Sequence, residues 1–326
     1  MLNKKAIGGY FELELPRNFS EKYPNALKFQ SARAAFLALL QQMPHIKRVW
    51  MPYYICDSMM MPVYAAGKEL SFYTINQQFK IEHPPELSAN DLLLYVNYFG
   101  ICDSNVFEVI AQFNPEQIII DCSQAFYSGP FQCLATIYSL RKFFGVPDGG
   151  LLVTSKDVVL PACQDVESIK RCTHLLERLA FSAETGYESY KMAEASLDDP
   201  TPKRMSQLTQ IIMATIDYSL IENKRSENFA FLQKELGSTN KIKIKDTSTV
   251  APLCYPYLQE KEQLKELLIN EKIFIPTYWP DVTSRINEIS FEKQLIKNML
   301  AIPCDQRYKK SDLTLVVDLI KQGEML

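Results

Sequence analysis

Short strand-like runs alternate with helical runs between residues 49 and 121, and this alternation constrains the fold more than any other feature of the sequence. The strand-like runs are 49–51, 69–73, 92–96 and 118–120. Helical patterns lie between them, at 57–66 and 106–112. Strands joined through helices usually pair in parallel, with helices on both faces of the sheet. The order therefore predicts an α/β fold with a mostly parallel sheet.

The segments on either side of this region extend the prediction. Residues 31–40 read as a helix with Ser31 at its N-cap and a strongly helix-favouring interior. Long helical patterns dominate from about 164 to 236. The remainder predicts a strand near 250–257, a helix at 260–270, a strand at 273–275 and terminal helices. We expect a large α/β domain, residues 1–236, and a small C-terminal α+β domain, residues 237–326.

Composition and charge narrow the class of partner. The chain has 326 residues, 47% of them hydrophobic, and 35 Lys and Arg nearly balance 38 Asp and Glu, so no basic nucleic-acid surface is expected. No stretch approaches the roughly 20 apolar residues of a membrane helix, and the N-terminus lacks a signal-peptide core. The eight cysteines are scattered, without a zinc or disulfide pattern. We expect small-molecule or protein partners, no metal and a cytoplasmic location.

Two residues at predicted strand ends carry the chemistry. Lys142 follows a strand-like run and precedes Gly149-Gly150, and its aromatic neighbours would favour the uncharged, nucleophilic amine. Asp121 ends another run, at the edge where open α/β sheets bind ligands. An amine for the aldehyde and a carboxylate for the pyridine nitrogen are what pyridoxal phosphate requires. A lysine extending to solvent and a helix-capping aspartate are the plainer interpretations.

The cofactor phosphate would bind at the helix start at Ser31, where free N–H groups and the helix dipole attract anions. Arg33 and the hydroxyls of Ser31 and Ser139 would add hydrogen bonds. Candidates for the ring face lie in one strand-to-helix turn and are Tyr53, Tyr54 and Cys56. An ordinary N-cap at Ser31 and a core role for the tyrosines stay open as alternatives.

Several short motifs occur in an order that resembles one known family. They are Ser31-x-Arg33-Ala34-Ala35, Pro52-Tyr53-Tyr54, Val96-Asn97-Tyr98-Phe99-Gly100, Asp121-x-x-Gln124-Ala125, Tyr138-Ser139-x-x-Lys142 and Asp148-Gly149-Gly150. This order resembles that of the DegT/DnrJ/StrS sugar aminotransferases, which are pyridoxal phosphate enzymes of fold type I, like aspartate aminotransferase. The likeness covers nearly the whole chain.

The resemblance implies specific roles. Lys142 matches the internal-aldimine lysine, Asp121 the partner of the pyridine nitrogen, and Gln124 the glutamine beside the ring. The phosphate-binding helix start matches Ser31, Ala32 and Arg33. Cys56 aligns with the usual ring-stacking position, with Tyr54 or Tyr53 as a substitute. The resemblance also implies a homodimer whose subunits complete each other's active sites.

These features predict a pyridoxal-dependent aminotransferase that transfers an amino group from an amino acid to a keto acceptor, such as a nucleotide-linked keto-sugar. One alternative is a homologue that binds pyridoxal phosphate but has a binding or regulatory role without transamination. Another is a nucleotide-binding α/β protein without pyridoxal, but the sequence contains neither GxGxxG nor GxxxxGK[ST].

Overall fold

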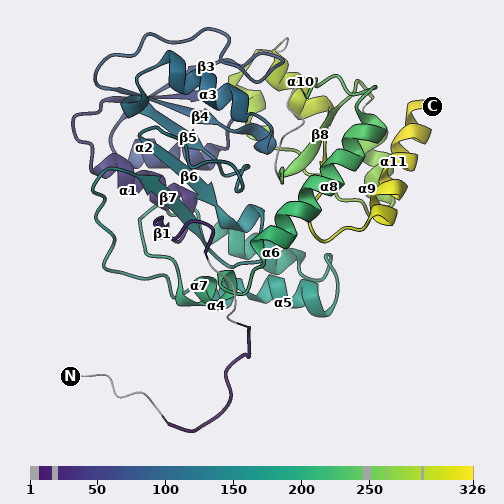
Figure 1. Cartoon of the computed structure of the whole chain (residues 1–326), viewed down its shortest axis with the longest axis horizontal. Coiled ribbons are helices and arrows are strands. Elements are labelled where there is room, and N and C mark those ends of the chain that lie inside the picture. Colours follow the sequence, from purple (N-terminus) through teal and green to yellow (C-terminus); the bar gives the residue numbers. More distant parts are fainter. Residues whose placement is uncertain (1–6, 17–20, 245–250, 262, 288–289, 326) are drawn as a thin grey trace.

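The computed structural model describes residues 7–16, 21–244, 251–261, 263–287 and 290–325. A central sheet with helices around it forms the larger part, and helices α8 to α11 with a small sheet lie to one side of it (Figure 1). No helix of these residues is long and apolar enough to cross a membrane.

The central sheet is seven-stranded, with the order β1-β7-β6-β5-β4-β2-β3. Its strands are β1 Leu27–Phe29, β2 Arg48–Pro52, β3 Glu69–Tyr73, β4 Asp91–Val96, β5 Ile118–Asp121, β6 Ala135–Ser139 and β7 Gly150–Thr154. Strands β2 to β6 pair in parallel, whereas β7 runs antiparallel to both β6 and β1. The predicted mostly parallel, mixed sheet is therefore confirmed.

Eight α-helices of the described residues lie between the start of the central sheet and the C-terminal part, and α1 and α2 pack directly on the sheet. They are α1 Ala32–Gln41, α2 Met61–Ala65, α3 Asp103–Gln112, α4 Ser168–Arg171, α5 Thr173–Ala180, α6 Tyr187–Ala195, α7 Gln207–Met213 and α8 Tyr218–Leu236. Helix α1 has the predicted cap, because the Ser31 hydroxyl accepts a hydrogen bond from the N–H of Ala34. The predicted helix at 57–66 is a 3-10 turn, η1 (Asp57–Met59), followed by the short helix α2.

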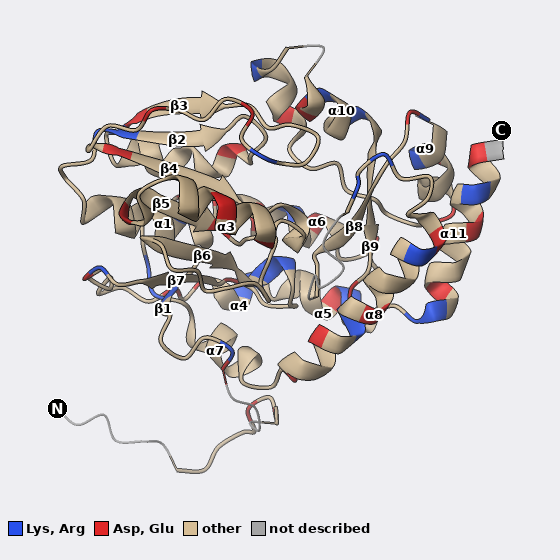
Figure 2. Ribbon diagram, turned by 45° about the horizontal axis from the view of Figure 1, so that its top comes forward, with Lys and Arg blue, Asp and Glu red and all other residues tan. Residues whose placement is uncertain are grey.

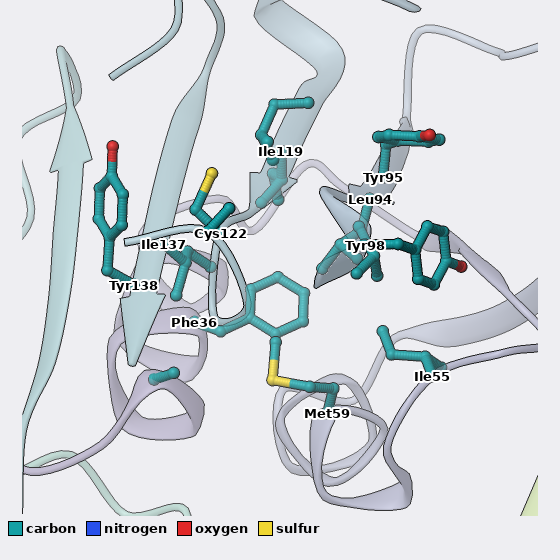
Figure 3. Packing of buried hydrophobic residues seen from close by; sticks show 14 of the residues in the cluster. Phe36, Ile55, Met59, Leu94, Tyr95, Tyr98, Ile119, Cys122, Ile137 and Tyr138 are labelled. Atoms are coloured by element: carbon teal, nitrogen blue, oxygen red, sulfur yellow. The ribbon is translucent and has the colours of Figure 1, made fainter. Parts of the chain in front are cut away.

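The core lies between α1 and the sheet. Phe36 of α1 and Met59 of η1 come together with Cys122 and Ile137 at the sheet (Figure 3). Charged residues lie mainly outside this core, and strands β4 to β6 carry them only at their ends (Figure 2). Burial on both faces explains why these strands are almost continuously apolar.

The C-terminal part contains a second sheet, formed by β8 (Cys254–Leu258) and β9 (Met299–Pro303) in antiparallel pairing. Its helices are α9 Gln263–Asn270, α10 Phe291–Asn298 and α11 Lys310–Met325. These strands, α9, α11 and the end of α8 share a second hydrophobic core. The domain boundary near Leu236 stays a prediction, since α8 contributes Phe229, Leu232 and Leu236 to this core.

The predicted strand at 273–275 is wrong, and the strand that pairs with β8 is β9 instead. Ile275 packs into the second core, whereas Phe274 is exposed. This apolar run therefore contacts the core through one side chain but does not pair with a β-strand. The apolar run of β9 follows α10 directly, where the sequence predicts only terminal helices. Pairing with a distant strand decides such short runs, and local sequence does not contain that information.

Phe36→Ala tests the core. Phe36 is fully buried, so losing its ring leaves a cavity between α1 and the sheet and is expected to lower the free energy of unfolding by about 3–5 kcal/mol. Urea denaturation measures this change. Phe107→Ala is the matched control, because that ring is 62% exposed and its loss should cost less than about 1 kcal/mol. Equal effects of the two changes would contradict the assignment of the core.

Candidate active site

The carboxyl ends of the parallel strands bring the candidate residues to one edge of the sheet. Val96 at the end of β4 pairs with Asp121 at the end of β5, and Asp121 pairs with Ile137 in β6. Ser139 ends β6, and Tyr53 and Tyr54 follow β2. Open α/β sheets bind ligands at this edge.

Asp121 is a buried carboxylate without a cationic partner. It is 4% exposed, and its Oδ1 accepts a hydrogen bond from the N–H of Ser123 at 2.8 Å. It forms no ion pair with the described residues. A buried carboxylate left unpaired is costly, so this group suits a positively charged ligand atom, such as a protonated pyridine nitrogen.

Gln124 has a buried donor without an acceptor. The side chain is 1% exposed, and its Oε1 accepts from the N–H of Phe99 at 3.0 Å. Its Nε2 has no hydrogen-bond partner within the part of the chain that the structure describes. An unsatisfied buried donor costs about 1–3 kcal/mol, which an acceptor on a ligand would recover.

A cradle for an anion forms where β7 meets the start of α1. Gly150 of β7 pairs with Ser139, and a Cβ on Gly150 would lie 2.2 Å from the carbonyl carbon of Ser31 and 2.4 Å from the nitrogen of Ala32. Because Gly150 has no side chain, the backbone of Ser31 and Ala32 can approach β7 beside Ser139. The first N–H groups of a helix have no intrahelical acceptor, so those of Ala32 and Arg33 can bind an anion such as a phosphate.

Arg33 lies in the first turn of α1 and pairs with Asp198 at 3.1 Å. The Asp198 side chain is 76% exposed, and an ion pair so open to solvent contributes only about 0–1 kcal/mol. The guanidinium can therefore exchange this carboxylate for another anion at the helix start.

Lys142 ends the 3-10 turn η4 (Leu140–Lys142) and is exposed. It has no hydrogen bond or ion pair with the described residues. The expectation that Tyr138, Phe143 and Phe144 desolvate its amine is wrong for the single chain. These rings are buried and pack around Phe126, at centroid distances of 6.1, 5.8 and 4.8 Å respectively, so they face the core.

The candidates for the ring face differ in accessibility. Tyr54 is fully buried, stacks on Tyr98 at 5.8 Å and meets the edge of Trp279 at 4.6 Å. Burial raises the pKa of its phenol, and its hydroxyl has no hydrogen-bond partner among the described residues. Cys56 is half-buried at the start of η1, with its sulfur 3.0 Å from the Ser58 hydroxyl. Tyr54 thus occupies the core, and Cys56 is the more accessible of the two.

Two residues that sequence reasoning did not select shape this edge. Asn97 is fully buried, donates to Asp103 at 2.6 Å and accepts from the N–H of Cys102 at 3.1 Å, which fixes the turn after β4. Its place directly after a buried strand was a usable signal. Arg225 of α8 reaches the backbone beside Lys142, and no local pattern indicated this.

The chain is similar in structure to several solved proteins. The sugar aminotransferase CalS13 from Micromonospora echinospora is 15% identical, with 92% of this chain and 88% of that chain covered and a TM-score of 0.60. NtdA from Bacillus subtilis, solved with bound cofactor PMP, is 14% identical, with coverages of 92% and 73% and a TM-score of 0.65. PseC from Helicobacter pylori, an aminotransferase of pseudoaminic acid biosynthesis, is 14% identical, with coverages of 92% and 87% and a TM-score of 0.59.

No protein-family model matches the chain, and no curated protein sequence matches it. The structural likeness therefore defines the fold. The chain has the α/β fold of the pyridoxal-dependent sugar aminotransferases, as the sequence predicted. The structure adds that the mixed sheet has seven strands and that a small second sheet is present.

Gly150→Ala tests the cradle. The added methyl group would overlap the backbone of Ser31 and Ala32, so α1 must shift, and we expect a loss of about 1–3 kcal/mol in the free energy of unfolding. Gly145→Ala is the control, because its Cβ would meet only a Leu175 methyl group at 3.8 Å. Urea denaturation measures the free energy of unfolding of both variants. Equal stability of the two variants would show that α1 does not press on Gly150.

Proposed function

We propose that this chain is a pyridoxal phosphate-dependent aminotransferase that transfers an amino group from an amino acid to a keto acceptor. A nucleotide-linked keto-sugar is the acceptor class we favour. The observation that carries the proposal is the unpaired, buried carboxylate of Asp121, on the same sheet edge as the anion cradle at Ser31. The fold shared with sugar aminotransferases supports it. The proposal includes a cytoplasmic location.

Each group of the cofactor has a matching group in the chain. Asp121 would hold the proton on the pyridine nitrogen, and the amide of Gln124 would donate beside the ring. Ser31 and Ser139, with the N–H groups of Ala32 and Arg33, would bind the phosphate. Cys56, or the turn at Tyr54, would lie against the ring.

Lys142 supplies the amine that would bind the cofactor aldehyde. Pyridoxal phosphate, when bound, supplies an electron sink that stabilises negative charge at the substrate carbon. The amine of Lys142, once free and uncharged, would move the proton between the substrate Cα and C4′ of the cofactor, in one direction with the amino acid and in the other with the keto acceptor. The carboxylate of Asp121 would keep the ring nitrogen protonated.

A second copy of the chain would complete this site. Lys142 is open to solvent in the single chain, whereas proton transfer at carbon benefits from the exclusion of water. Helices α5 and α6 and their connection expose large apolar side chains, among them Leu176, Leu179, Phe181, Tyr187 and Met192. Such a surface is typical of an interface. Glu194 of α6 pairs with Arg141, so this surface adjoins the turn of Lys142.

Lys142→Ala tests the proposal. The wild-type chain with pyridoxal phosphate should show a visible absorption band, and borohydride should fix the cofactor to Lys142 in the mass spectrum. The variant should lose both and lose turnover by roughly 10²–10⁴-fold. Lys156→Ala is the control, because that lysine pairs with Glu116 at 2.6 Å, outside the site. A variant that keeps the band and the turnover would refute the role of Lys142.

An amino donor distinguishes the aminotransferase from a pyridoxal-binding protein without transamination. Glutamate and other amino acids are added in turn to the loaded protein, and the band is followed. Conversion to the pyridoxamine form is the expected outcome. A band that persists with every donor would favour the binding or regulatory role.

Leu176→Glu combined with Leu179→Glu tests the dimer. The two residues are three positions apart on α5 and share a face, so two carboxylates there should separate the subunits and weaken cofactor binding. Analytical ultracentrifugation and cofactor titration measure the two effects. Leu315→Glu, at an exposed position of α11, is the control. A double variant that stays dimeric would place the interface elsewhere.

A further inference from the structure

Arg225 of α8 is a buried cation that binds backbone and amide oxygens. It is 2% exposed, and burial lowers its pKa. Its Nε donates to Oε1 of Gln306 at 2.9 Å, and its Nη1 donates to the carbonyl of Pro252 at 3.0 Å. It forms no ion pair with a carboxylate among the described residues. The Asp305 carboxylate acts on this charge without bonding to it, and a buried charge whose hydrogen-bond acceptors are all neutral is expensive, which suggests a role other than stability.

One contact of Arg225 lies directly beside Lys142. The carbonyl of Phe143, the next residue, accepts from Nη2 of Arg225 at 3.4 Å and from Nε2 of Gln306 at 3.0 Å. The guanidinium carbon also lies 4.6 Å from the centroid of the Phe143 ring, a cation–π contact. Backbone and ring together fix the end of the turn that carries Lys142.

A second path leads from Arg225 to Gln124. Its Nη1 lies 3.4 Å from the carbonyl of Leu253, and the N–H of Leu253 donates to the carbonyl of Phe99 at 2.8 Å. The N–H of Phe99 donates in turn to Oε1 of Gln124 at 3.0 Å. These bonds connect the two sides of the candidate site through one guanidinium, and the last of them, from the N–H of Phe99, contacts the Gln124 amide.

We propose that Arg225, with Gln306, is a positioning element that sets the place of Lys142 relative to Gln124. The inference rests on the proposed function, because it assigns these residues to the site that binds pyridoxal phosphate. Both act through the carbonyl of Phe143, and Arg225 acts also through the carbonyl of Leu253. Neither would contact the substrate. Gln306 follows β9, so the element also links Lys142 to the C-terminal sheet.

The geometry explains why an arginine is present here. A planar guanidinium offers five donors in a rigid fork, so it can reach oxygens in three separate segments at once. Lysine has a single nitrogen and can satisfy only part of this set. An apolar residue would fill the space but leave the carbonyl of Phe143 with the single bond from Gln306.

Gln306→Ala and Arg225→Lys test the inference in the full-length protein. We measure the cofactor Kd by titration, the visible circular dichroism per bound cofactor, and the free energy of unfolding in urea without cofactor. Gln306→Ala removes the bonds of Gln306 to Arg225 and to the Phe143 carbonyl, so it should raise the Kd about 5- to 10-fold and weaken the dichroism. Arg225→Lys keeps the charge, so it should keep more of the dichroism than Arg225→Met.

Arg307→Ala is the matched control. It lies beside Gln306, but its guanidinium pairs with Asp305 at 2.7 and 2.8 Å and contacts the ring of Tyr308. It should bind the cofactor as the wild type does. Gln306→Ala remains informative if the Arg225 variants do not fold, because Gln306 is only partly buried.

The outcomes separate this inference from the proposed function. The inference would be overturned if the wild type binds the cofactor and both Gln306→Ala and Arg225→Lys keep the wild-type Kd and dichroism. The proposed function would then still stand. If the two residues have a purely structural role, their variants should have a lower free energy of unfolding but an unchanged dichroism per bound cofactor. That result would also overturn the inference. Absence of cofactor binding by the wild type would overturn the proposed function and this inference with it.

Discussion

The pairing of Val96, Asp121 and Ile137 across three parallel strands is the constraint on which the rest of the site depends. It places Asp121 at the edge of the sheet, and it aligns the end of β6 with that edge. The antiparallel strand β7 then pairs Gly150 with Ser139 at the same edge. Because Gly150 approaches Ser31 closely, the start of α1 also lies at this edge. A shift of one residue in this pairing would turn the carboxylate to the opposite face.

Several polar groups of this edge are left unsatisfied in the single chain. Asp121 lacks a cation, the Nε2 of Gln124 lacks an acceptor, and Lys142 lacks any partner among the described residues. Asp121 and Gln124 are buried, and buried polar groups are normally paired except where a ligand provides the missing partner, whereas Lys142 is exposed. The three groups differ in what they require: a cation, an acceptor and an electrophile. One ligand, pyridoxal phosphate, offers all three, which a simple anion or nucleotide would not.

Sequence predicted most of the sheet and the start of α1, because these depend on local pattern. The strand at Glu69–Tyr73 and the Ser31 cap were correct to the residue. Strand β9 was missed because its existence depends on pairing with β8 across many intervening residues. The exposure of Lys142 was also missed. Neighbours in sequence do not reveal that Phe143 and Phe144 turn toward Phe126 and leave the lysine outside.

The two residues that flank Lys142 are held by different parts of the chain. Arg141 pairs with Glu194 of α6, beside the exposed apolar side chains of α5 and α6, whereas the carbonyl of Phe143 is held by α8 and the segment after β9. The lysine side chain between them is exposed and forms no hydrogen bond or ion pair with the described residues. A partner subunit docked on α5 and α6 would therefore reach the lysine through Arg141, and the C-terminal sheet reaches it through Phe143. Assembly and the second core would thus act on the same amine from two directions, although neither contacts it directly.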